Sequence, residues 1–195
     1  MDLQNFDPLH NTPSGLSRRE FLGLSITAAV ASLVPSEIYA ASEKIQTAKK
    51  ICLHNVYTSE TIEPVFWRDG EYLPEALSDI NHIFRDIRTG KERTINKELI
   101  NLLYDLQQEV KIEEPFHIVS GYRTPRSNAL LRKTTKGVAK NSFHMYGKAA
   151  DIRLPDYNLS TLRRKAMNLR VGGVGYYPRS SFIHVDVGAV RYWRG

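Results

Sequence analysis

Apolar residues recur at helical spacing in two early segments of the chain. These segments cover 74–88, which stops before Gly90, and 97–110. Because residues three or four apart share one face of a helix, both segments are predicted to be amphipathic helices. Their apolar faces consist of Leu77, Ile80, Phe84 and Ile87 in the first and Ile100, Leu103, Leu106 and Val110 in the second. Ser160 predicts the cap of a third helix, which runs to about Arg170.

Short β-prone runs predict six strands around these helices. The runs at 50–57 and 61–67 are separated by a short polar segment and are predicted to form a hairpin. Further strands are expected at 116–120, 149–154, 174–177 and 182–187. The polar stretch 121–142 is expected to be a long loop with a helical turn near 128–133. Helices come early and strands late, which favours a single α+β domain with a central antiparallel sheet and helices packed on one side.

The first 40 residues have the pattern of an export signal. The paired residues Arg18 and Arg19 precede Phe21, and a short uncharged run of small and apolar residues leads to Ala40. That run is too short to cross a bilayer comfortably, which takes about 20 residues. The pattern resembles the twin-arginine export signal, so we expect residues 1–40 to be removed and residues 41–195 to work in the periplasm. A buried N-terminal helix and an uncleaved signal anchor are the alternatives.

Composition excludes several classes of protein and of metal site. The 195 residues are 42% hydrophobic and 25% charged, which is ordinary for a soluble globular protein. The single cysteine, Cys52, allows neither an intramolecular disulfide nor a zinc site built on paired cysteines. Any metal site must therefore use histidines and carboxylates.

Two histidines and an aspartate form the candidate metal site. They are His144, Asp151 and His184, and two imidazoles with one carboxylate suit Zn²⁺. Three protein ligands leave a fourth tetrahedral position for water, which is typical of catalytic zinc. Within the predicted last strand, His184 and Asp186 are two residues apart and therefore project from the same face.

The order of these residues resembles a known zinc motif. The segment 142–151 reads Ser-x-His-x-x-Gly-x-Ala-x-Asp and is followed by the strand histidine His184. This pattern resembles the motif of the M15-type metallopeptidases, the D-alanyl-D-alanine peptidase family. Two more segments fit the same family, Ser-Gly-Tyr-Arg at 120–123 and the glycine-rich run at 172–180 with the Phe-Ile-His-Val-Asp that follows. The similarity covers essentially the whole of 41–195.

The resemblance implies a zinc-dependent endopeptidase of the cell wall. It implies one Zn²⁺ on His144, Asp151 and His184, and cleavage of peptidoglycan cross-links at D-alanyl-diaminopimelate bonds, diaminopimelate-diaminopimelate bonds, or both. Arg123 is expected to lie beside the metal and to face the scissile peptide or a substrate carboxylate. A guanidinium fork suits a carboxylate or a developing oxyanion. Ser142 and Tyr122 are expected to line the substrate cleft.

The general base is the point at which the sequence departs from the family pattern. Many members have a Glu three residues before the last ligand or a His two residues before it, whereas this chain has Ser181 and Phe182. Asp186 is the first candidate for the base, because it shares a face with His184. It is equally a candidate for orienting a metal ligand. His117 is a weaker candidate for the base.

The charge balance favours an anionic wall polymer as partner. Residues 1–40 hold two of the basic and four of the acidic residues, which leaves 25 basic against 17 acidic residues, a formal charge of +8. The basic residues are scattered and carry no nucleic-acid-binding signature, so a nucleic-acid partner is not expected. Free carboxylates of peptidoglycan would be attracted over a long range. Two alternatives to the endopeptidase stay open, a D,D-carboxypeptidase or dipeptidase and a non-catalytic, zinc-stabilised wall-binding module.

Overall fold

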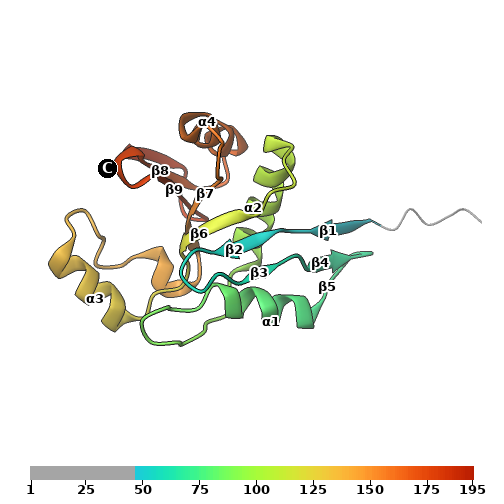
Figure 1. Cartoon of the computed structure of the whole chain (residues 1–195), viewed down its shortest axis with the longest axis horizontal. Coiled ribbons are helices and arrows are strands. Elements are labelled where there is room, and N and C mark those ends of the chain that lie inside the picture. The colour runs from blue at the N-terminus through green and yellow to red at the C-terminus, as the bar shows by residue number, and fades with distance from the viewer. Residues whose placement is uncertain (1–46) are drawn as a thin grey trace, which may run out of the picture. The chain divides into compact units, whose positions relative to one another are not determined.

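A computed structural model describes residues 47–195, and a seven-stranded mixed sheet lies at its centre (Figure 1). The strand order is β10-β8-β9-β7-β6-β2-β3. The strands are β2 (Leu53–Asn55), β3 (Thr61–Ile62), β6 (Phe116–Ser120), β7 (Ala149–Arg153), β8 (Gly173–Tyr177), β9 (Phe182–Asp186) and β10 (Arg191–Arg194). The four central strands are antiparallel, as predicted, and one parallel pair flanks them on each side, β10 with β8 and β2 with β6.

The predicted N-terminal hairpin is present but is shared between two sheets. β2 pairs with β3 in the large sheet, whereas β1 (Ala48–Lys50) pairs with β4 (Val65–Arg68) in a small one that β5 (Glu71–Tyr72) completes. The hairpin is confirmed, and the divided pairing separates each predicted strand into two short ones.

Four α-helices accompany the sheets within residues 47–195. They are α1 (Pro74–Ile83), α2 (Lys97–Val110), α3 (Pro125–Thr134) and α4 (Leu159–Leu169). The bounds of α2 are those predicted. α1 ends five residues earlier than its apolar spacing predicts, because the chain leaves the helix at Phe84. Beyond this turn, the side chain of Asp86 accepts a hydrogen bond from the Thr124 amide. The cap of α4 is Asn158, whose side chain accepts from the Thr161 amide, and not Ser160.

Helix α3 occupies part of the predicted loop 121–142, and it confirms and extends the helical turn predicted near 128–133. Thr124 caps it by accepting a hydrogen bond from the Ser127 amide, and Pro125 occupies its first turn. The helix is largely polar and exposed, so it lacks the apolar repeat from which α1 and α2 were predicted. The cap and the proline were the available signals.

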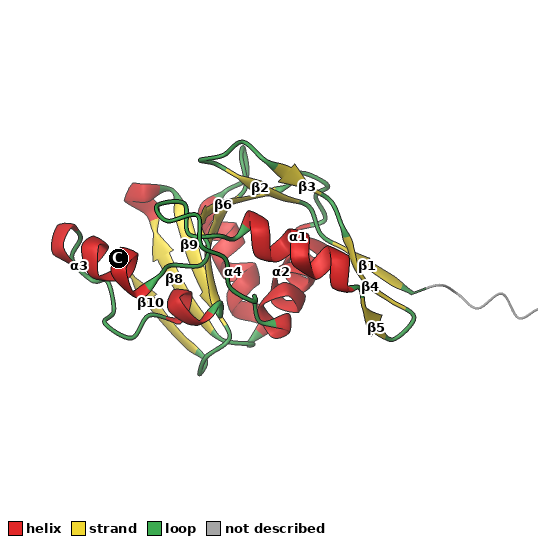
Figure 2. Ribbon diagram, turned by 90° about the horizontal axis from the view of Figure 1, so that it is seen from below, coloured by secondary structure: helices red, strands yellow, loops and turns green. Residues whose placement is uncertain are grey.

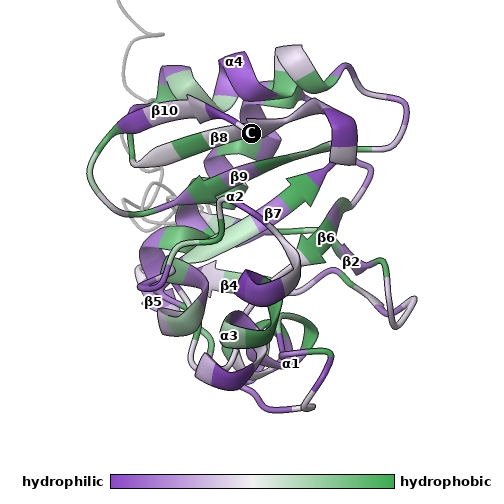
Figure 3. Cartoon of the chain, turned by 90° about the vertical axis from the view of Figure 1, so that its left-hand side faces the viewer, coloured by the Kyte–Doolittle hydropathy of each residue, from purple (hydrophilic) through white to green (hydrophobic). Residues whose placement is uncertain are grey.

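The two faces of the large sheet have different roles. α2 and α4 lie against one face (Figures 1 and 2), where Ile118, Ile152, Ile183 and Val185 belong to one buried core with α1. In Figure 3 the central strands carry long hydrophobic stretches, whereas the outer strand β10 is mostly hydrophilic. Because side chains alternate along a strand, the neighbours of these core residues project to the opposite face. That face carries the candidate site.

The predicted export signal and the search for membrane-spanning helices concern different parts of the chain. The predicted signal peptide, residues 1–40, lies outside the residues that the structure describes. Within residues 47–195, no helix combines the length and the apolar character that a bilayer crossing requires.

Candidate metal centre

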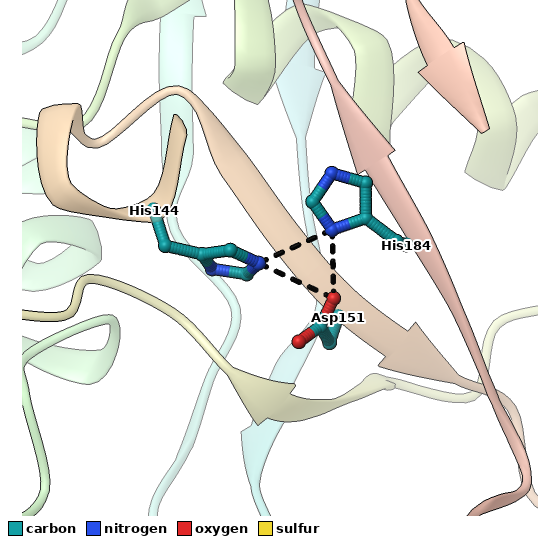
Figure 4. A group of neighbouring side chains, drawn as sticks. All are labelled: His144, Asp151 and His184. Atoms are coloured by element: carbon teal, nitrogen blue, oxygen red, sulfur yellow. Dashed lines mark hydrogen bonds and ion pairs between the residues drawn. The ribbon is translucent and has the colours of Figure 1, made fainter. Parts of the chain in front are cut away.

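The structure brings the three predicted metal ligands together (Figure 4). His144 lies in a short 3-10 helix, η2 (Phe143–Tyr146), and Asp151 and His184 are direct cross-strand partners on β7 and β9. His184 Nδ1 is 2.9 Å from Asp151 Oδ1 and 3.2 Å from His144 Nε2, which is 3.3 Å from Asp151 Oδ1. All three side chains are largely buried.

The remaining ring nitrogens are engaged away from this cluster. His144 Nδ1 donates to the Gly121 carbonyl at 2.7 Å, and His184 Nε2 donates to Asp186 Oδ2 at 3.0 Å. In their neutral forms both imidazoles then turn lone pairs toward the carboxylate of Asp151. Three acceptors that face one another are stabilised by a cation between them.

The donor set and its spacing fit zinc. Metal–ligand bonds of about 2.0–2.1 Å in a tetrahedron place neighbouring ligand atoms about 3.3 Å apart. The three distances in the structure, 2.9, 3.2 and 3.3 Å, approach that value. Two nitrogens and one oxygen are also a common catalytic zinc set that leaves a fourth position free.

Burial and the facing charges shift the pKa of each member. Burial lowers the pKa of His144 and so favours its neutral imidazole. Burial would raise the pKa of Asp151, but the two histidines outweigh it and hold the pKa far below its usual range. Burial would lower the pKa of His184, yet the carboxylates of Asp151 and Asp186 raise it. The cluster therefore favours a positive charge at His184 Nδ1, which a proton or a metal ion can supply.

Asp186 lies behind His184 and does not line the cavity in front of the cluster. Its oxygens accept from the Gly173 and Gly188 amides at 3.2 and 2.8 Å and pair with both terminal nitrogens of Arg191 at 3.0 and 2.6 Å. Burial would raise the pKa of Asp186, but His184 and Arg191 hold it well below its usual range. This ionised carboxylate faces the ring nitrogen remote from the metal cluster, which is the position of a ligand-orienting group.

A cavity of about 610 Å³ opens in front of the cluster. Arg123, Ser142 and Tyr122, the three predicted substrate-binding residues, all line it. Arg123 donates from a terminal nitrogen to Ser142 Oγ at 3.1 Å, and its amide donates to the His144 carbonyl at 3.2 Å. Burial and the charge of Arg88 lower the pKa of Arg123, whereas Asp151 opposes them. Arg123 therefore lines the cavity in front of the metal cluster, and its backbone is bonded to one of the three ligands.

His117, the weaker candidate for the base, lies elsewhere on the sheet. Its ring contacts that of His54 at a centroid distance of 4.6 Å, and it is absent from the cavity lining. Burial, together with His54 and Arg153, lowers the pKa of His117. The structure does not bring this residue to the metal cluster.

Strand β10 contributes two cavity residues that the sequence did not predict, Arg191 and Trp193. The ring of Trp193 is 5.2 Å from that of His184, and its Nε1 donates to the Tyr177 hydroxyl at 2.9 Å. The indole fits only because Gly175 lies beneath it, since a Cβ there would be 2.6 Å from the ring. Glycines at the alternate positions 173 and 175 of β8 were the signal that large side chains pack closely against this strand.

Comparison with known proteins places the chain among wall peptidases. Residues 43–193 match the M15-type sequence family described as peptidoglycan L,D-endopeptidase MepK. The protein of Escherichia coli (strain K12) with that name is 38% identical over 177 residues, which cover 91% of this chain and 97% of the relative. The probable peptidoglycan L,D-endopeptidase MepK of Haemophilus influenzae is 34% identical over 182 residues, or 92% and 96% of the two chains.

Proposed function

Because the chain belongs to the M15-type family of peptidoglycan L,D-endopeptidase MepK, we propose that it is a zinc-dependent endopeptidase that opens the peptide cross-links of peptidoglycan. The convergence of His144, Asp151 and His184 on the wall of an open cavity is the observation that carries this proposal. The L,D designation of the relatives favours the diaminopimelate-diaminopimelate bond over the D-alanyl-diaminopimelate bond.

Some residues of the site are proposed to bind the metal and others to bind the substrate. His144, Asp151 and His184 would hold the zinc, which when bound would polarise the scissile carbonyl and activate water. Asp186 fixes the tautomer of His184 by accepting a hydrogen bond from its Nε2, so we assign it a positioning role in place of the base role that the sequence favours. Arg123 presents donors to the oxyanion that develops at the carbonyl.

The place of action follows from the substrate. Peptidoglycan lies outside the cytoplasmic membrane, so we propose that the chain is exported to the periplasm. The paired arginines at 18 and 19 support the twin-arginine machinery as the export partner.

Purified peptidoglycan sacculi test the proposed activity directly. The zinc-loaded protein is incubated with sacculi, and the released muropeptides are separated and identified by mass. We expect cross-linked dimers to be lost and monomers to be gained, with the masses of the products identifying the bond. His184→Ala should abolish the conversion, whereas His54→Ala, a histidine of the same sheet outside the cavity, should leave it unchanged.

The same experiment separates the alternatives. Sacculi that are bound but unchanged would indicate a wall-binding module instead of an enzyme. Removal of the terminal residue from a monomeric pentapeptide, with dimers left intact, would indicate a D,D-carboxypeptidase.

A further inference from the structure

Two arginines from separate segments line the same cavity. Arg88 follows α1, and Arg123 precedes α3, 35 positions later in the chain. Within residues 47–195, neither guanidinium forms an ion pair with a carboxylate, and Arg123 Nε is buried without a hydrogen-bond partner. Two like charges that line one cavity repel each other, and an anion bound between them would relieve that repulsion.

A buried carboxylate holds both arginine-bearing segments in place. Asp86 is 2% exposed, and its Oδ2 accepts from the amide and the hydroxyl of Thr124 at 2.7 and 2.8 Å. Its Oδ1 accepts from the Arg88 amide at 2.9 Å. Asp86 therefore fixes the backbone at Arg88 and next to Arg123, while its oxygens are occupied by these bonds. Asp86 therefore takes up neither guanidinium group, and the side-chain bond of Arg123 goes to the neutral hydroxyl of Ser142.

The backbone also fixes this pair relative to the metal cluster. The Arg123 amide donates to the carbonyl of His144, and His144 Nδ1 donates to the carbonyl of Gly121. An anion between the arginines would thus lie at a defined place beside the metal ligands. The lining of the same cavity also includes Ile87 and Tyr57, which are 43% and 60% exposed. The cavity therefore offers apolar surface for the aliphatic stem of an amino acid as well as two cations.

We propose that Arg88 joins Arg123 in binding a free carboxylate of the substrate, on the residue that supplies the nitrogen of the cleaved bond. This inference rests on the proposed function. In a cross-link to diaminopimelate, that residue carries a carboxylate on the carbon next to the scissile nitrogen, so the carboxylate must lie within a few ångströms of the metal cluster. Guanidinium groups match a carboxylate by paired, charge-assisted hydrogen bonds. Arg88 is thereby a specificity residue that distinguishes a carboxylate from a neutral carboxamide.

Two muropeptide dimers that differ only at this group test the proposal. One dimer carries the free carboxylate and the other the carboxamide, and kcat/KM is measured for each with the zinc-loaded protein. Because hydrogen bonds between charged groups are the stronger ones, we expect the protein to prefer the carboxylate by about 10- to 100-fold. Arg88→Gln should lose about tenfold on the carboxylate dimer, mainly through KM, and little on the carboxamide dimer. Arg88→Lys should retain part of the preference.

The control variant removes the same charge from another place. Arg126 lies in the exposed first turn of α3, outside the cavity lining. Arg126→Gln should therefore leave both values of kcat/KM unchanged. Equal cleavage of the two dimers by the unmodified protein, or an equal loss on both with Arg88→Gln, would overturn the carboxylate site and leave the endopeptidase standing. Cleavage of neither dimer would instead overturn the proposed function itself.

Discussion

The role of Asp186 depends on which nitrogen of His184 it faces. Because it accepts from Nε2, its charge increases the donor strength of Nδ1 and holds the ring in place. We expect Asp186→Asn to weaken zinc binding by about 10- to 100-fold, the usual effect of losing a group that orients a metal ligand. Competition with a chromophoric chelator measures the affinity, and activity is compared at saturating zinc.

Asp105→Asn is the matched control, because it removes the same charge from an exposed position on α2. It should change neither zinc affinity nor activity. Unaltered zinc affinity in Asp186→Asn, combined with complete loss of activity at saturating zinc, would restore Asp186 as the general base.

Asp86 makes the stability of the fold depend on pH. Burial would raise its pKa, but hydrogen bonds from Ser127, Thr124 and Arg88 outweigh burial and lower it. A carboxyl group with a depressed pKa in the folded state contributes stability above its unfolded pKa of about 3.9 and loses that contribution as the pH falls through the folded pKa. We therefore expect Asp86→Asn to lower the free energy of unfolding by about 1–3 kcal/mol at neutral pH and by less in acid.

Urea unfolding at about pH 7 and about pH 3 measures this difference, on either side of the unfolded pKa. The loss should be smaller at the lower pH. An equal loss of unfolding free energy at the two pH values would show that the negative charge of Asp86 does not contribute to stability.

Among the elements, those with a strong local pattern were predicted and those without one were not. Helix α2 was predicted in full, because its apolar residues repeat over four turns and Asn96 caps it. Helix α3 was predicted only as a helical turn near 128–133, because its buried residues are polar and leave no apolar repeat in the sequence. Strand β10 was not predicted, because its four residues include two arginines and its parallel pairing with β8 is set by the sheet.

Strands β8 and β10 meet where Gly175 lies beneath Trp193. We expect Gly175→Ala to destabilise the protein by about 1–3 kcal/mol, since the added methyl group would displace the indole. In a Trp193→Leu background the same substitution should cost much less, because the smaller side chain leaves room. Denaturant unfolding of the two single variants and the double variant measures the coupling between the positions. An identical cost in both backgrounds would place the strain in the strand itself and not in the contact with Trp193.

At the scale of the molecule, the sequence was a better guide to which residues lie close together than to the orientation of each side chain. The order of His144, Asp151 and His184, which resembles the M15-type zinc motif, predicted three residues that the structure brings together. The orientation of Asp186 could not be predicted, because it depends on Arg191 from β10, a strand absent from the prediction. Arg88 gave no local signal, since it reaches the cavity only through the contact of Asp86 with the start of α3.

The excess of basic residues gives a property of the whole chain that can be measured. Residues 41–195 carry a formal charge of +8, and the wall polymer carries many carboxylates, so attraction should speed their encounter. We expect cleavage of sacculi to fall several-fold as salt rises from about 0.1 M to about 1 M, because the screening length shortens from about 10 Å to about 3 Å. The soluble carboxamide dimer, which carries less charge, is the comparison substrate. If attraction to the polymer controls the encounter, cleavage of this dimer should depend less on salt than cleavage of sacculi. An equal salt dependence for the two substrates would show that the effect arises at the active site and not from the charge of the whole surface.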